Sequence, residues 1–230
     1  KIKIHYPNYN SDFKIRNLAM AIKALKLCGL NMSSIFRSIK KLKDINGRLE
    51  LVKKYPNGVK IFVDYAHTPD ALLNTLKSLK SDYGKDISLV FGCGGDRDRK
   101  KRSLMAKIAN KFCKKIYITD DNPRNENPSK IRNELLKHIH KKKAFNIGVR
   151  AFAIKKAISN AEDQELILIA GKGHEEHQVY KNKTINISDK KIIKKLNIKF
   201  KTLNKKKLIF SQNKSIISRI FRKKISLNFN

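Results

Sequence analysis

The sequence predicts an α/β fold in which helices cover both faces of a mostly parallel sheet. Between about residues 47 and 195, short apolar runs alternate with amphipathic helical segments. Strands that are apolar at nearly every position are typical of parallel sheets, because both of their faces are buried. Polar and glycine-rich loops follow these runs, and in such folds ligands bind at the carboxyl ends of the strands.

Length and composition agree with a folded protein. The chain has 230 residues, of which 40% are hydrophobic, and this length allows one full domain plus a fragment, or two small domains. It holds no stretch of about 18 apolar residues, which excludes a transmembrane helix. The three cysteines lack the spacing of zinc ligands or of a disulfide framework, so we expect neither.

Two helices are expected before the alternation begins. An apolar stripe from Leu18 to Leu25 predicts the first helix, and Gly29 ends it. A second amphipathic segment spans residues 32–42, and the pattern changes near Gly47.

The alternation itself consists of apolar runs, each paired with a helical segment. Strands are expected at about residues 59–63, 87–91, 115–119 and 165–170. Helices are expected at about residues 69–79, 102–112, 129–140 and 151–161.

Chemically rich loops follow every predicted strand, at residues 64–70, 92–98, 120–124 and 171–175. Because the carboxyl ends of parallel strands share one edge of a sheet, we expect these loops, which we call the rim, to form one functional site.

The rim carries groups that suit an amino-acid ligand. Arg97 and Arg124 can each grip a carboxylate or phosphate with two parallel hydrogen bonds. Asn122 can both donate and accept, and Glu175 can hold an ammonium group. A structural interpretation remains open for each loop: Arg97 paired with a neighbouring acid, Asp121 or Asn122 capping a turn, and an ordinary strand-to-helix loop around Glu175.

Phosphate-binding and metal-binding signals are weak. Gly171-Lys172-Gly173 is not a P-loop, which needs Gly-x-x-x-x-Gly-Lys-Ser/Thr. His67 and His174 lie on the rim without a second ligand at metal spacing, so no metal site is predicted in the chain.

The net charge of +34 invites a nucleic-acid or anionic-membrane interpretation. However, the basic residues are scattered, and the chain is rich in Lys, Ile and Asn, whose codons are AT-rich. We therefore expect no nucleic-acid partner. A basic tail of unknown role is predicted at residues 197–230, and a noncatalytic module that binds nucleic acid or anionic lipid through residues 190–230 is kept as an alternative.

Taken together, the motifs closely resemble those of the Mur ligase family. The resemblance rests on Asp64–Asp70, Gly92–Arg102 and Gly171–Glu175 in that order, and it covers about four fifths of the chain. Asp121-Asn122-Pro123-Arg124 resembles the signature of the branch that adds meso-diaminopimelate.

The resemblance implies a cytoplasmic ligase of peptidoglycan synthesis that uses ATP and Mg²⁺. ATP would phosphorylate the terminal carboxylate of UDP-MurNAc-L-Ala-D-Glu, and the incoming amine would attack the acyl phosphate. Residues 1–50 would be the end of a central ATPase domain, and residues 51–196 the Rossmann-like, amino-acid-binding C-terminal domain.

The same resemblance implies roles for individual residues. Those that would hold or shape the meso-diaminopimelate site are Arg97, Asp121, Asn122, Pro123, Arg124, Gly171 and Glu175. Those that would contact or lie close to ATP are Arg48, Asp64 and His67.

The sequence departs from the family pattern in three ways. The UDP-binding domain, the P-loop and the residues that hold Mg²⁺ are absent, so we expect this chain to be inactive alone and to need ligase domains that another chain could supply. Val149-Arg150 stands where the family usually has Asp-Arg, which puts a local salt bridge in question. Residues 197–230 have no counterpart in the family pattern.

A related amide ligase, similar to folylpolyglutamate or cyanophycin synthetase, is the alternative enzyme.

Overall fold

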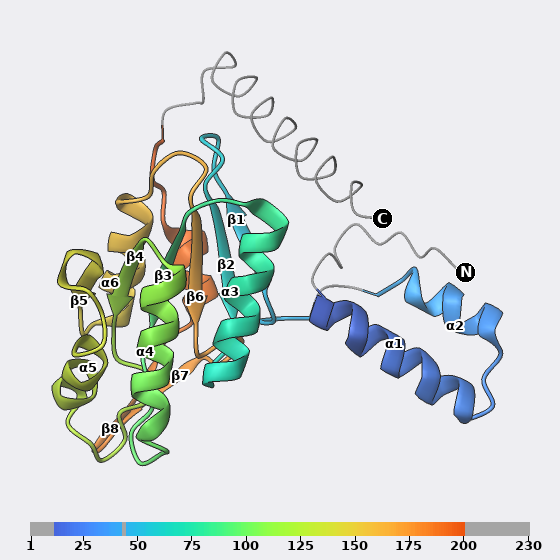
Figure 1. Cartoon of the computed structure of the whole chain (residues 1–230), viewed down its shortest axis with the longest axis horizontal. Coiled ribbons are helices and arrows are strands. Elements are labelled where there is room, and N and C mark those ends of the chain that lie inside the picture. The colour runs from blue at the N-terminus through green and yellow to red at the C-terminus, as the bar shows by residue number, and fades with distance from the viewer. Residues whose placement is uncertain (1–11, 43–44, 201–230) are drawn as a thin grey trace, which may run out of the picture.

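The computed structural model describes residues 12–42 and 45–200, so most of the expected basic tail, residues 201–230, lies outside the described part. Helices α1 (Asp12–Leu27) and α2 (Met32–Ile39) contact each other and lie to one side of a larger, sheet-containing part (Figure 1). Both expected N-terminal helices are present, and the second ends three residues earlier than expected, at Ile39 rather than Leu42.

The larger part is built on a sheet of order β1-β2-β6-β3-β4-β5. Strand β1 is antiparallel to β2, and every other neighbouring pair is parallel, which confirms the predicted mostly parallel sheet. The strands are β1 (Glu50–Lys54), β2 (Lys60–Asp64), β3 (Ile87–Phe91), β4 (Lys115–Ile118), β5 (Ala144–Asn146) and β6 (Leu166–Ala170).

Helices cover both faces of this sheet, as the apolar strands predict. Successive side chains of β2 alternate between two cores: Phe62 packs in the same cluster as Leu72 of α3, and Ile61 in the same cluster as Ile154 of α6. The covering helices are α3 (Pro69–Tyr83), α4 (Lys100–Phe112) and α5 (Pro128–Leu136) on one face, and α6 (Arg150–Ser159) and α7 (Asp189–Lys195) on the other.

Local signals set the ends of α3, the helix that follows the first rim loop. The Thr68 hydroxyl accepts a hydrogen bond from the Ala71 N–H, and Pro69 opens the helix, where its missing N–H costs nothing. Gly84 ends it in the left-handed conformation, with φ of 62°. The helix therefore runs four residues beyond the expected end at Leu79.

The main differences from expectation are elements that carry little apolar signal. Strand β1, the three-residue β5, the short 3₁₀ helix η1 (Lys141–Lys143), helix α7 and the hairpin of β7 (His177–Tyr180) and β8 (Lys183–Asn186) were not predicted. The hairpin is mostly exposed, and Gln178 is its only buried residue. Partly exposed strands lack the continuous apolar run by which buried strands are predicted.

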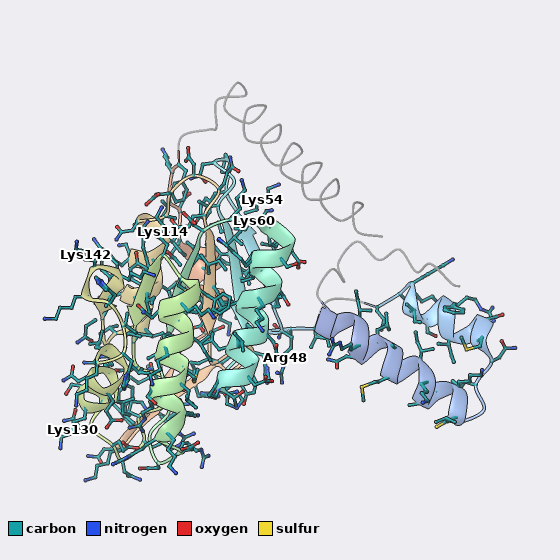
Figure 2. The ribbon with its side chains drawn as sticks, viewed as in Figure 1. Arg48, Lys54, Lys60, Lys114, Lys130 and Lys142 are labelled. Atoms are coloured by element: carbon teal, nitrogen blue, oxygen red, sulfur yellow. The ribbon has the colours of Figure 1, made fainter. Side chains whose placement is uncertain are left out.

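Basic side chains are distributed around the sheet-containing part rather than gathered in one patch. Figure 2 shows Lys54, Lys60, Lys114 and Lys142 toward one end of this part, with Lys130 toward the other. Within the described ranges, no helix combines the length and the apolar character needed to cross a bilayer.

Candidate functional site

The loops of the rim lie side by side in the structure. Strands β2, β6, β3 and β4 are parallel neighbours in that order. Four loops lie at the carboxyl ends of these strands and therefore meet along one edge of the sheet. The first begins at the last residue of β2, and the four span residues 64–70, 171–175, 92–98 and 120–124.

The glycine-rich loop after β3 packs directly on the loop after β4. The Gly95 N–H donates to the Asn122 carbonyl at 2.9 Å, and a Cβ atom on Gly95 would lie 1.9 Å from the Pro123 carbonyl oxygen. Only glycine permits this approach. Asp121 and Pro123 are both buried, and Asp121 Oδ1 accepts the Asn122 N–H at 2.7 Å. These contacts fix the turn that presents Asn122 and Arg124.

Arg124 is held by one nitrogen of its guanidinium group. Nη1 donates to the carbonyls of Gly95 at 2.9 Å and Asn122 at 3.3 Å, while the backbone N–H donates to Val179 in β7. Nε and Nη2 form no hydrogen bond with any other described residue. Arg124 therefore retains charged donors for an anionic ligand.

The amide of Asn122 has a fixed orientation. Its Oδ1 accepts from Lys172 Nζ at 3.2 Å and from the Val179 N–H at 3.0 Å, and its Nδ2 donates to Glu175 Oε2 at 3.4 Å. With Oδ1 engaged twice, Asn122 offers a ligand a donor rather than an acceptor. The sequence had left both options open.

Lys172 lies at the centre of this arrangement, although its Gly-Lys-Gly context gave no specific signal. It is fully buried, and its ammonium contacts Glu175 Oε2 at 3.1 Å as well as Asn122. Burial raises the pKa of Glu175, but bonding to Lys172, the charge of Lys172, and hydrogen bonds from Asn122 and Tyr65 outweigh it and hold that pKa below its usual value. Glu175 is thus an ionised, half-buried acceptor.

Of two further predicted site residues, Gly171 contacts this cluster and Arg97 does not. Gly171 is buried against the Asp121 carboxylate, and its N–H donates to the Asp64 carbonyl at 3.1 Å. Arg97 is exposed and forms no hydrogen bond or ion pair with any described residue. The structure therefore brings Asn122, Arg124 and Glu175 together but leaves Arg97 extended toward solvent.

The three residues that the family resemblance assigns to ATP are two exposed side chains and one buried side chain. Arg48 lies over the Tyr65 ring at 4.6 Å, and His67 Nδ1 is 2.8 Å from the Tyr65 carbonyl oxygen, with both side chains exposed. Asp64 is instead buried. It accepts hydrogen bonds from the N–H groups of Leu49 and Ala66 and from the hydroxyl of Thr75 in α3. Burial raises its pKa despite these hydrogen bonds. Asp64 therefore holds the chain that carries Arg48.

The segment that leads from the helix pair touches the loop after β6 through backbone atoms. A Cβ atom on Gly47 would lie 2.3 Å from the His174 nitrogen, and one on Gly173 would lie 2.8 Å from the Gly47 carbonyl oxygen. We call this contact between Gly47 and residues 173–174 the joint. Gly47 and Gly173 both have positive φ, at 68° and 55°.

Arg102, a residue with no role assigned from the sequence, supports the glycine-rich loop. Its side chain is 1% exposed, and it donates to Glu126, to Glu134 and to the Gly94 carbonyl. The Arg102 guanidinium lowers the pKa of Glu126 to about 2, helped by the Asp96 N–H. This network ties the glycine-rich loop to α4 and α5.

Among the described residues, no group of three or more His, Cys, Asp or Glu side chains could hold a metal ion.

Comparison with known proteins gives a consistent result. A family described as "Mur ligase, glutamate ligase domain" matches residues 47–173. The chain is 41% identical over 186 residues to a UDP-N-acetylmuramoyl-L-alanyl-D-glutamate--2,6-diaminopimelate ligase of Rickettsia typhi, covering 80% of this chain and 37% of that protein. It is 43% identical over 182 residues to the ligase of that name from Buchnera aphidicola, covering 79% and 36%.

Solved structures agree. A structure of a UDP-N-acetylmuramoyl-L-alanyl-D-glutamate--2,6-diaminopimelate ligase superimposes with a TM-score of 0.62 at 34% identity, covering 80% of this chain and 38% of the other. A folylpolyglutamate synthase from Thermotoga maritima gives 0.52 at 25% identity, covering 70% and 36%. The chain thus spans just over a third of the length of the curated relatives it matches.

Proposed function

The chain belongs to the Mur ligase family, and we propose that it supplies the amino-acid-binding part of a ligase that adds meso-diaminopimelate to UDP-MurNAc-L-Ala-D-Glu. ATP would phosphorylate the terminal carboxylate of the dipeptide. The amine of diaminopimelate would then attack the acyl phosphate, so that an amide forms and phosphate leaves. The names of the curated relatives support this pair of substrates.

The observation that carries the proposal is the preformed cluster of Asn122, Arg124, Lys172 and Glu175. Meso-diaminopimelate carries carboxylates and ammonium groups at both ends. The free N–H groups of Arg124 and the Nδ2 of Asn122 suit one carboxylate, and the ionised Glu175 suits an ammonium group. Arg97, on the neighbouring loop, is proposed as the second guanidinium that closes on the ligand.

The ATP side of the reaction is proposed for the opposite end of the rim. Arg48 and His67 flank Tyr65, where they would contact the nucleotide, and Asp64 would act by positioning the Leu49 backbone beside Arg48. ATP supplies the phosphoryl group, and the residues named here bind and orient rather than transfer protons.

The Mg²⁺ ligands are proposed for the part of the relatives that this chain does not span. We propose residues 1–50 as the end of the ATPase domain and residues 51–196 as the amino-acid-binding domain.

Calorimetry with the 230-residue chain tests the proposal. Meso-diaminopimelate is expected to bind saturably but weakly, and Arg124→Ala to weaken binding at least about tenfold, because a charge-assisted bidentate contact contributes roughly 1.5–3 kcal/mol. Lys142→Ala is the matched control, since Lys142 is exposed and lies toward the other end of the sheet-containing part (Figure 2). No heat at millimolar ligand, or an Arg124→Ala variant that binds normally, would contradict the proposal.

The alternatives give different results in the same experiment. Tighter binding of L-glutamate than of meso-diaminopimelate would favour a folylpolyglutamate synthetase-like ligase, to which the fold is similar. L-lysine lacks one carboxylate and is expected to bind more weakly. A basic module would instead bind a polyanion with an affinity that falls steeply with salt and disappears when residues 197–230 are deleted.

A further inference from the structure

Beside the rim cluster lies a cavity that the proposed amino-acid site does not use. It has a volume of about 770 Å³, opens to solvent, and is lined by the β7–β8 hairpin, the start of α6 and helix α7. None of Asn122, Arg124 and Glu175 lines it. The hairpin contributes Gln178 and Tyr180 from one face of β7, because alternate strand residues face the same side.

The lining carries more basic than acidic side chains. The lining includes Arg150 and the lysines at 183, 191 and 195, with Glu176 as its one acidic residue. Glu176 is already paired with Lys191 at 2.9 Å. Apolar walls come from Val149, from Ile185 and Ile187, and from Ile192. The cavity therefore suits an anion that carries an apolar body.

The start of α6 adds backbone donors that no side chain caps. Residue 149, the position before the helix, is Val, whose side chain cannot accept a hydrogen bond from the first N–H groups. Uncapped N–H groups and the positive end of the helix dipole favour an anion at this position. This end of the helix lines the cavity through residues 149–151.

Two buried side chains supply an independent observation. Gln178 is 3% exposed and its Nε2 has no hydrogen-bond partner among the described residues, although leaving a buried amide unpaired is costly. Gln178 lies on the hairpin face that lines the cavity. Arg150 also lines the cavity, and it is 1% exposed. Its Nη1 has no hydrogen-bond partner among the described residues, whereas Nε and Nη2 donate to Asp189 and Nη2 also donates to the Ala170 carbonyl.

We propose that this cavity binds a small organic oxyanion, a phosphomonoester or a carboxylate on an apolar body, between the start of α6 and the β7–β8 hairpin. The oxyanion accepts from the first N–H groups of α6 and from the Gln178 amide. The lysines at the mouth attract it, and the isoleucines contact its apolar body. The site is separate from the amino-acid site and does not depend on the proposed ligase function.

The test is calorimetry of the full chain with phenyl phosphate at fixed ionic strength, with benzoate and inorganic phosphate as further arms. Phenyl phosphate or benzoate is expected to bind saturably, and the tighter of the two identifies the preferred oxyanion. Val149→Asp is expected to weaken binding at least about tenfold, because its carboxylate caps the helix and repels the anion. Aspartate is a preferred cap, so this variant is expected to melt no lower than the unaltered chain. Gln178→Met is expected to weaken binding about threefold to tenfold through the lost donor.

Leu104→Asp is the matched control, because Leu104 and Val149 are 49% and 54% exposed and both changes add one negative charge. It is expected to bind phenyl phosphate within about twofold of the unaltered chain, since Leu104 does not line the cavity. Absence of saturable binding to both aromatic probes would overturn the proposal. Equal affinity of the Val149→Asp and Leu104→Asp variants, or displacement of the probe by meso-diaminopimelate, would do so too.

Discussion

The buried ion pair between α6 and α7 leads to a quantitative stability prediction. Arg150 Nε and Nη2 donate to Asp189 Oδ1 and Oδ2 at 2.8 and 2.7 Å, and the two side chains are 0% and 1% exposed. Burial disfavours the charge of Arg150, but Asp189 outweighs it and raises the Arg150 pKa. Asp189→Asn leaves this buried guanidinium without its negatively charged partner. We expect the free energy of unfolding to fall by about 3–5 kcal/mol.

A double variant separates the lost charge pair from lost packing. Arg150→Met combined with Asp189→Leu removes both charges and fills similar volume, so it is expected to recover most of the stability that Asp189→Asn loses. Glu176→Gln is the surface control, because the Lys191–Glu176 pair has the similar distance of 2.9 Å but is 68% and 49% exposed. Its expected cost is below about 1 kcal/mol.

Urea unfolding followed by far-ultraviolet circular dichroism at pH 7 measures all these values. An Asp189→Asn variant whose free energy of unfolding lies within about 1 kcal/mol of the unaltered chain would contradict this prediction, because an unpaired buried charge must cost more than an exposed one. A double variant as unstable as the single one would contradict it as well.

Three further predictions concern the rim and its support. Lys172→Met is expected to weaken meso-diaminopimelate binding about tenfold in calorimetry, because the Glu175 carboxylate loses its ion pair and the Asn122 Oδ1 loses one of its two hydrogen bonds. Unchanged affinity would show that Lys172 does not position these groups. Gly95→Ala is expected to lower the melting temperature and abolish that binding, since its methyl group would overlap the Pro123 carbonyl; a normal melting curve would argue against it. Glu126, whose pKa falls from 4.5 to about 2 through its bonds to Arg102, contributes stability that is complete above pH 4.5 and lost as the pH falls toward 2. Glu126→Gln should therefore flatten this loss in unfolding curves measured between pH 5 and pH 3.

Periodicity was sufficient to predict the sheet and the place of the rim. Residues 87–91 and 166–170 are buried at every position, so their apolar runs identify strands covered on both sides. The polar loops follow directly, and their grouping is a consequence of parallel topology. The helix after β4 is shorter than predicted. It ends at Leu136 rather than at His140, and residues 137–140 turn toward η1.

What the sequence could not supply are contacts between distant residues. The orientation of Asn122 depends on Lys172 and Val179, which are 50 and 57 residues away. The question over a salt bridge at Val149-Arg150 is resolved by Asp189, 39 residues along the chain, which pairs with Arg150. Such pairings depend on where helices and hairpins dock, which local propensity does not determine.

The joint has a mechanical consequence. Gly47 lies between the helix pair and the sheet, and it meets residues 173–174 backbone to backbone, just before Glu175 in the loop. Close-packed backbone atoms transmit displacement because they have no room to yield. A shift of the Gly47 backbone would therefore displace residues 173–174, next to Glu175 in the loop, and a ligand that moved Glu175 would displace Gly47 in turn. Binding near Arg48, the residue after Gly47, and binding at Glu175 would then be thermodynamically coupled, each altering the affinity of the other by the same factor.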